Sequence, residues 1–128
     1  MIAGKKFDKK YFTSDSYDDY KKDLKEWVVK PTARKIYSFL TESRKAGRRL
    51  EDEATASSPK ILDAGCGFGD LIAELQDKYK FSVAGLEISP YAIKQACPSI
   101  KAKIKDGSIL KLPFKKNSFN AVICFDVV

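Results

Sequence analysis

The sequence contains no histidine and only three cysteines, Cys66, Cys97 and Cys124. No pair of cysteines has the C-x-x-C spacing of a zinc site or a redox pair, so we expect no metal centre. An odd number of unpaired cysteines is typical of a protein in a reducing compartment. No run of about 18 apolar residues is present, which excludes a membrane span, and no secretory signal is visible. We therefore expect a cytoplasmic protein without a membrane partner.

Acidic residues are fewer than basic ones. The sequence has 24 Lys and Arg and 17 Asp and Glu, which gives a net charge of +7. Residues 1–60 hold 15 basic and 10 acidic residues, or +5, and residues 61–128 hold 9 and 7, or +2. Such a balance suits nucleic acid, anionic lipid or an acidic partner. Because acids are interleaved with the bases, a solvated lysine-rich surface is the simpler interpretation. A hydrophobic content of 44% over 128 residues indicates one modest folded domain.

The N-terminal part, residues 1–58, is predicted to form a polar arm followed by helices. A first helix is expected from Ser16, with Asp19 completing a capping box, until Pro31 ends or kinks it. A second helix then runs to a glycine cap at Gly47, and residues 48–59 form a linker. The predicted apolar faces consist of Tyr17, Tyr20, Leu24, Trp27 and Val28 in the first helix, and of Ile36, Phe39 and Leu40 in the second.

From Lys60 onward, short apolar runs alternate with amphipathic segments. Strands are expected at 60–65, 81–88, 102–106 and 119–128. Helices are expected at 70–79, with Leu71, Ile72 and Leu75 facing inward, and from Pro90 to a stop near Pro98; residues 112–118 form a loop. The order β-α-β-α-β-loop-β predicts an α/β fold, a parallel sheet with helices on its faces.

Three glycines, Gly65, Gly67 and Gly69, follow the first strand at alternate positions. A glycine-rich turn between a strand and a helix brings backbone N–H groups and the helix N-terminus close to a ligand. The dinucleotide fingerprint fits only in part, because its third glycine would fall on Asp70, and the lysine of a P-loop is absent. Asp63 inside the turn would repel a pyrophosphate and would suit a cationic or amino-bearing ligand.

Two further acids end the next two strands. Glu87 lies 22 positions after Gly65, where a carboxylate can accept both hydroxyls of an adenosine ribose. Asp106 ends the third strand and could accept the exocyclic amine of a purine. Any one of these acids alone is most often a loop or cap residue. Together with the glycines, three acids at successive strand ends predict a nucleoside site.

Four segments, LDAGCGFG, GLEIS, DGSILKLPF and NSFNAVICFDVV, resemble in order the motifs of class I S-adenosylmethionine-dependent methyltransferases, closest to the small-molecule branch of type 11 or 12. The resemblance covers about residues 60–128 and implies a Rossmann-like three-layer αβα sandwich. The sheet of that family has seven strands in the order 3-2-1-4-5-7-6. This chain supplies strands 3-2-1-4, so we expect a chain truncated after the fourth strand. Residues 59–128 would form the cofactor-binding half and residues 1–58 the lid.

The resemblance also implies a binding role for S-adenosyl-L-methionine at each strand end. Asp63 and the segment Gly65, Cys66 and Gly67 would hold the methionine part, Glu87 the ribose, and Ile88 would pack on the adenine. Asp106 would bind the adenine amine. The remaining candidates are Gly107 and Ser108 beside Asp106, Cys124 and Phe125 near the sulfonium, and Tyr17 and Tyr20, with Tyr11, on the lid. Packing of these tyrosines on the core is an equally good interpretation.

No catalytic residue is assigned, and without histidine any base would be Asp, Glu, Tyr or water, with Asp126 a weak candidate. A small molecule is favoured as the methyl acceptor, and RNA stays an alternative. Other hypotheses are a non-catalytic cofactor-binding module completed by a partner chain, and a nicotinamide-dependent oxidoreductase, which the glycine spacing disfavours. The apolar fourth strand would leave an open edge, which predicts self-association.

Overall fold

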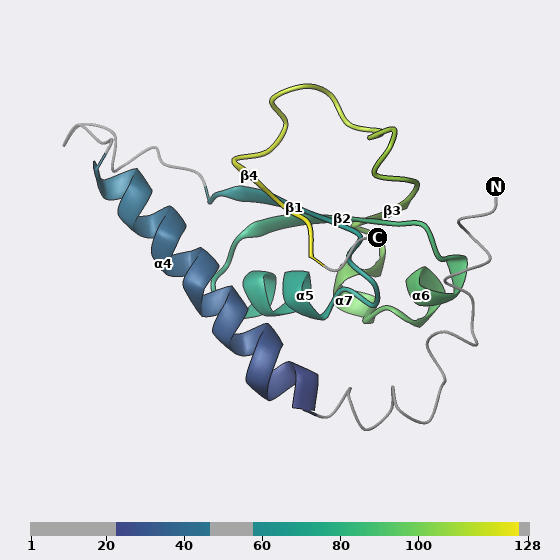
Figure 1. The fold of residues 1–128 in the computed structure, drawn as a ribbon, viewed down its shortest axis with the longest axis horizontal. Coiled ribbons are helices and arrows are strands. Elements are labelled where there is room, and N and C mark those ends of the chain that lie inside the picture. Colours follow the sequence, from purple (N-terminus) through teal and green to yellow (C-terminus); the bar gives the residue numbers. More distant parts are fainter. Residues whose placement is uncertain (1–22, 47–57, 126–128) are drawn as a thin grey trace.

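A computed structural model describes residues 23–46 and 58–125 of the chain, and its centre is a four-stranded parallel sheet (Figure 1). The strands β1 (Lys60–Ala64), β2 (Ser82–Glu87), β3 (Ile104–Asp106) and β4 (Ala121–Ile123) lie in the order β3-β2-β1-β4. This order confirms the predicted α/β, Rossmann-like fold class. Because all four strands are parallel, their carboxyl ends meet at one edge of the sheet.

Three helices connect the strands. They are α5 (Asp70–Asp77), α6 (Pro90–Gln95) and α7 (Pro98–Lys101). In Figure 1 they lie below the sheet, while the segment that leads from β3 to β4 loops above it. Helix α7 was not expected, since Pro98 was predicted to stop a helix. Instead Pro98 is the first residue of a new one, a position where its missing N–H costs nothing.

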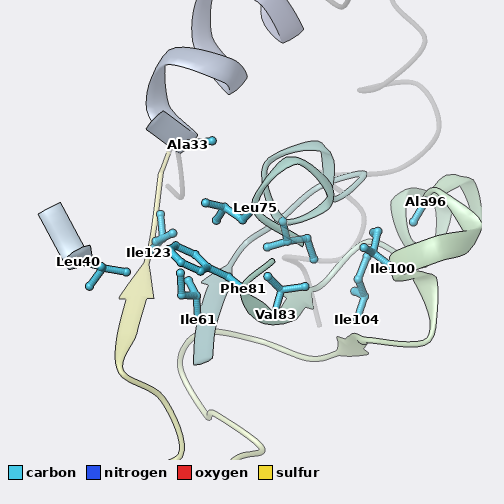
Figure 2. Packing of buried hydrophobic residues seen from close by; sticks show 11 residues of the cluster. Ala33, Leu40, Ile61, Leu75, Phe81, Val83, Ala96, Ile100, Ile104 and Ile123 are labelled. Carbon is cyan, nitrogen blue, oxygen red and sulfur yellow. The ribbon is translucent and has the colours of Figure 1, made fainter. Parts of the chain in front are cut away.

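The core lies between the sheet and these helices (Figure 2). Alternate strand residues point toward α5, whose Ile72 and Leu75 are fully buried, as their spacing predicted. Leu71 is partly buried against the same core. The strand residues of this cluster are Ile61, Val83, Ile104 and Ile123.

The N-terminal helices form one continuous helical run, a π-helical turn η1 (Lys25–Val29) followed by α4 (Lys30–Ala46). Of the two predicted outcomes, that Pro31 ends or kinks the helix, the first is therefore wrong. The Lys30 N–H donates to the Lys25 carbonyl, five residues back. This wider turn relieves the contact between the proline ring and the carbonyl four residues before it, so the chain passes Pro31 without a break.

The buried face of this helical run differs from the predicted one. Val29, Ala33 and Leu40 are buried, whereas Trp27 and Phe39 are 78% and 69% exposed and Val28 is also exposed. The π-helical turn changes the angular phase of the residues before Lys30, which a constant period of 3.6 cannot anticipate. The helix is anchored by Tyr37, whose ring stacks on Tyr79 at 4.7 Å and lies 5.8 Å from the Phe81 ring.

The fourth strand is shorter than predicted. Within the described residues it covers only Ala121–Ile123, so Cys124 and Phe125 follow it rather than belong to it. Its partner β1 pairs with it over Ile61–Asp63, and Gly65 then turns the chain away with a φ of +86°. The pairing surface therefore ends before the apolar run does.

Several predictions fall on residues 1–22, 47–57 and 126–128, which lie outside the described part. They concern the arm, the Ser16 cap, Gly47, most of the linker and Asp126, as well as Tyr11, Tyr17 and Tyr20. Where the chain is described, none of its helices has the length and hydropathy needed to cross a bilayer.

Candidate functional site

The glycine loop after β1 needs glycine for its backbone conformation. Gly65, Gly67 and Gly69 have φ angles of +86°, +57° and +80°, in the left-handed region that side chains rarely adopt. At Gly69 a Cβ would also lie 2.3 Å from Cδ1 of Ile100. At Gly67 a Cβ would meet nothing within 4 Å, so the open space there is available to a ligand. The backbone conformation therefore favours glycine at all three positions, and close packing gives a second reason at Gly69.

Backbone hydrogen bonds attach this loop to the end of β2. The N–H groups of Gly65 and Cys66 both donate to the Leu86 carbonyl, at 2.7 and 3.0 Å. The Gly67 N–H donates to Oε2 of Glu87 at 2.7 Å. The loop is thus held by one carbonyl and one carboxylate of the neighbouring strand.

Glu87 is buried and supplies the central carboxylate of the site. Its Oε1 accepts hydrogen bonds from the N–H groups of Ile88 and Ser89, both at 2.9 Å. With the Gly67 bond on Oε2, three of about four acceptor positions of the carboxylate are used. Binding of both ribose hydroxyls, as predicted, would therefore require the Gly67 bond to be released or shared.

Asp63 is equally buried, and no residue of the described segments donates a hydrogen bond to its carboxyl group. Burial, and then the negative charge of Glu87, raise its pKa to about 7. The free energy cost of this buried charge would fall if a cation lay beside it. The predicted cationic ligand beside Asp63 would lower this cost and stays a prediction.

Cys66 lies in the loop beside these two acids. Burial, followed by the charges of Asp63 and Glu87, raises the pKa of its thiol, so the sulfur stays protonated at neutral pH. The Sγ atom donates to the Gly67 carbonyl at 3.8 Å. Cys66 can therefore pack and donate, and it is unsuited to act as a nucleophile.

The third strand ends beside Glu87. Asp106 is the register partner of Glu87, and the Gly107 N–H donates to the Glu87 carbonyl at 3.0 Å. Asp106 is exposed, in contrast to Asp63 and Glu87, whereas Ile88, Gly107 and Ser108 are partly buried. The three predicted acids therefore do lie at successive strand ends of one sheet edge.

The remaining predicted residues are less well defined. Cys124 and Phe125 follow β4, whose Ile123 pairs with Asp63, and both are exposed. Tyr17 and Tyr20 lie outside the described residues. In residues 23–46 and 58–125, no group of three or more Cys, Asp or Glu side chains could hold a metal ion.

Sequence reasoning missed Ser89, which links the site to α6. Its N–H donates to Glu87, and its fully buried Oγ accepts from the Ala92 N–H at 3.2 Å. A Ser-Pro pair before a helical segment is a helix-start signal that could have identified this cap. Ser89 thereby couples the orientation of the Glu87 carboxylate to the start of the helix.

The family of the chain follows from a comparison with known protein families. A protein-family model described as a methyltransferase domain matches residues 61–128. The chain belongs to this methyltransferase family. It has the class I fold of S-adenosylmethionine-dependent methyltransferases.

Curated relatives of this methyltransferase chain are much longer than the region they share with it. The chain is 36% identical over 66 residues to 2-methyl-6-phytyl-1,4-hydroquinone methyltransferase of Synechocystis, covering 48% of this chain and 21% of that protein. It is 26% identical over 119 residues to 24-methylenesterol C-methyltransferase 2 of Arabidopsis thaliana, covering 83% and 33%. The matches thus span between a fifth and a third of the length of these two relatives.

A solved structure supports the fold. Magnesium protoporphyrin IX methyltransferase of Synechocystis, crystallised with bound S-adenosylmethionine, aligns with a TM-score of 0.58 at 20% identity. The alignment covers 91% of this chain and 59% of that one. The same arrangement of strands and helices is therefore found in a protein that binds this cofactor.

The residues present in this methyltransferase chain fit the cofactor. S-adenosylmethionine combines a sulfonium and an ammonium group with a nucleoside. The buried Asp63 carboxyl group offers a negative charge with no protein donor among the described residues, and Gly67 leaves open space. Asp63 lies near the end of β1 and Gly67 in the loop that follows, where a ligand of an open parallel sheet is expected.

Proposed function

We propose that this chain is the cofactor-binding part of an enzyme that transfers a methyl group from S-adenosylmethionine to a lipophilic small molecule. The acceptor class is supported by two relatives, which by name act on a phytyl-substituted hydroquinone and on a methylenesterol. Both compounds are largely hydrocarbon. A small-molecule acceptor is also what the sequence motifs favour.

The observation that carries the proposal is the carboxyl group of Asp63 beside the glycine loop, which is buried and accepts no hydrogen bond from residues 23–46 or 58–125. In our proposal Asp63 and the loop from Gly65 to Gly67 hold the methionine part. Glu87 accepts a ribose hydroxyl through Oε2, which has the remaining acceptor position. Adenine contacts are assigned to Ile88 and to the segment Asp106–Ser108, and Cys124 and Phe125 to the neighbourhood of the sulfonium.

When bound, the cofactor supplies an electrophilic methyl group. The protein residues contribute position and charge, which suffice for an in-line displacement whose acceptor is already nucleophilic. The free thiols of Cys66, Cys97 and Cys124 support our proposal that the enzyme works in the cytoplasm.

Isothermal titration calorimetry tests the cofactor assignment. The chain should bind S-adenosylhomocysteine and should not bind NAD, and Asp63→Ala should weaken binding by about tenfold or more because a charged contact is lost. Asp77→Ala is the matched control, since Asp77 ends α5 and lies away from the loop. Binding of NAD alone, or equal affinity in the two variants, would contradict the assignment.

A transfer assay with radiolabelled S-adenosylmethionine tests the acceptor class. A prenylated hydroquinone, a sterol and a transfer RNA are offered in parallel. Labelling of either lipophilic compound supports the proposal, and labelling of RNA alone overturns it. If the chain binds cofactor and labels none of them, the non-catalytic module becomes the better interpretation.

A further inference from the structure

The helical run η1–α4 carries apolar side chains on the side away from the core. Trp27 is 78% exposed, Phe39 69% and Val28 47%, which are unusual values for large apolar residues on a helix. Val28 and Phe39 are each followed by a buried residue, Val29 and Leu40, so the two exposed side chains lie on a common side of the helix. We call Trp27, Val28 and Phe39 the outer apolar face.

This face is not needed to hold the helix on the domain. Val29, Ala33 and Leu40 are buried against the core on the other side, and the Tyr37 ring stacks on Tyr79. The attachment is thus complete without the outer apolar face. In Figure 1 the helix lies along one side of the domain, beside α5 rather than within the sheet layers.

The helix that carries the outer apolar face has a net positive charge. Residues 23–46 contain six basic residues against three acidic ones, which gives +3. One of the acids, Glu26, is already paired with Lys30 at 2.5 Å. The basic residues are Lys25, Lys30, Arg34, Lys35, Arg44 and Lys45. A helix with exposed aromatic residues and a cationic surround is typical of helices that lie on an anionic bilayer surface.

We propose that η1–α4 docks on an anionic lipid bilayer surface through Trp27, Val28 and Phe39, with the surrounding lysines and arginines against the headgroups. The sequence has no membrane span, from which we expected no membrane partner, but contact with a bilayer surface requires no span. A second copy of the chain is a poorer occupant, since two such helices would bring like charges together. The inference goes beyond the proposed function and depends on different residues.

Trp27 is the single tryptophan of the chain and therefore reports on this face directly. The full chain is titrated with vesicles of phosphatidylcholine, alone or mixed with phosphatidylglycerol. With the anionic vesicles alone, the fluorescence emission of Trp27 should shift to shorter wavelength, and its quenching by acrylamide should decrease. The shift should weaken at high salt, because screening reduces the attraction of lysine and arginine to the headgroups.

A variant pair tests the assignment of residues. Phe39→Ser should weaken vesicle binding by about tenfold or more, the effect expected from losing burial of one large apolar side chain. Leu110→Ser is the control, because Leu110 is 92% exposed but lies in the loop after β3. Circular dichroism checks that both variants are folded, and cofactor titration separates this test from that of the proposed function.

Three results would overturn the inference. The first is unchanged emission with anionic vesicles, or equal binding by the Phe39→Ser and Leu110→Ser variants. The second is a blue shift that depends on protein concentration without lipid, which would indicate a second copy. The third is emission that is already blue and protected in dilute protein, which would mean that another segment of the same chain covers the face.

Discussion

At the scale of single residues, Asp63 has the largest energetic consequence. Its folded-state pKa of about 7 exceeds the value of 3.8 for the free side chain, so the folded chain binds more protons between these two values. The associated stability is fully present below the lower pKa and is lost as pH rises through the higher one. Above neutral pH the folded protein therefore bears the full cost of a buried charge.

Replacing Asp63 by asparagine removes this proton linkage. The free energy of unfolding of the Asp63→Asn variant should rise relative to wild type between pH 4 and pH 7, by up to about 4 kcal/mol, and stay level above that. Urea titrations at several pH values measure it. A difference between the two proteins that does not change with pH would contradict the buried position of this carboxyl group.

Ionisation of Asp63 also affects cofactor binding. Because the sulfonium and ammonium groups attract ionised Asp63, affinity for S-adenosylmethionine should increase as pH rises through about 7. Calorimetry from pH 6 to pH 8 tests this, and the Asp63→Asn variant, which has no charge to gain, is the control. An affinity that falls over this range, or a parallel rise in the variant, would count against the role of Asp63.

The glycines of the loop differ in what they require. Gly69→Ala should destabilise the fold by about 2–4 kcal/mol, since its Cβ would combine an unfavourable φ of +80° with a 2.3 Å contact to Ile100. Gly67→Ala adds the conformational cost alone, about 1–2 kcal/mol. Thermal unfolding of the two variants compares them directly, and equal losses would argue against close packing at Gly69.

At the scale of elements, stacking of one aromatic side chain adds to the buried contacts that dock α4. Tyr37→Ala should destabilise the protein by about 1.5 kcal/mol, because the stacking on Tyr79 and Phe81 is lost. Phe39→Ala on the same helix should change stability by less than about 0.5 kcal/mol, since Phe39 is 69% exposed. Chemical denaturation of both variants checks the pair. The reverse ranking would mean that the helix packs through its other face.

At the scale of the whole molecule, the open edge of β4 predicts association. In the part of the chain that the structure describes, β4 pairs only with β1, and its Val122 is 58% exposed. Sedimentation velocity should show a fraction of dimer that increases with protein concentration. The Val122→Lys variant should remain monomeric, because a charged residue on an edge strand blocks edge pairing. A monomer at every concentration, or a dimer unaffected by the lysine, would exclude pairing through this edge.

Most of the sheet could be predicted because its signals are local. The apolar runs and the position of Pro90 indicated strands and a helix within a few residues of their observed ends. Asp63, Glu87 and Asp106 were placed correctly at the sheet edge, since parallel strands must end there together. Helix α7 was missed because Pro98 can equally stop one helix or start another.

Two features could not be predicted, for the same reason. The exposure of Trp27 follows from a π-helical turn before Pro31, and that of Phe39 from the way α4 lies against α5. The occupied carboxylate of Glu87 results from the path of the glycine loop, which brings the Gly67 N–H within 2.7 Å. Both depend on how one segment lies against another.

The sequence by itself therefore indicated the fold class, the methyltransferase family and the edge of the sheet where we propose the site. Strand periodicity indicated the fold class, and the family was indicated by the resemblance of four successive motifs to known methyltransferases. Only the tertiary structure decided that Asp63 is buried without a donor among the described residues while Glu87 accepts three backbone N–H groups. Hydrogen bonding at each acid depends on neighbours from other parts of the chain, and it differs although both acids are buried near the ends of similar apolar strands.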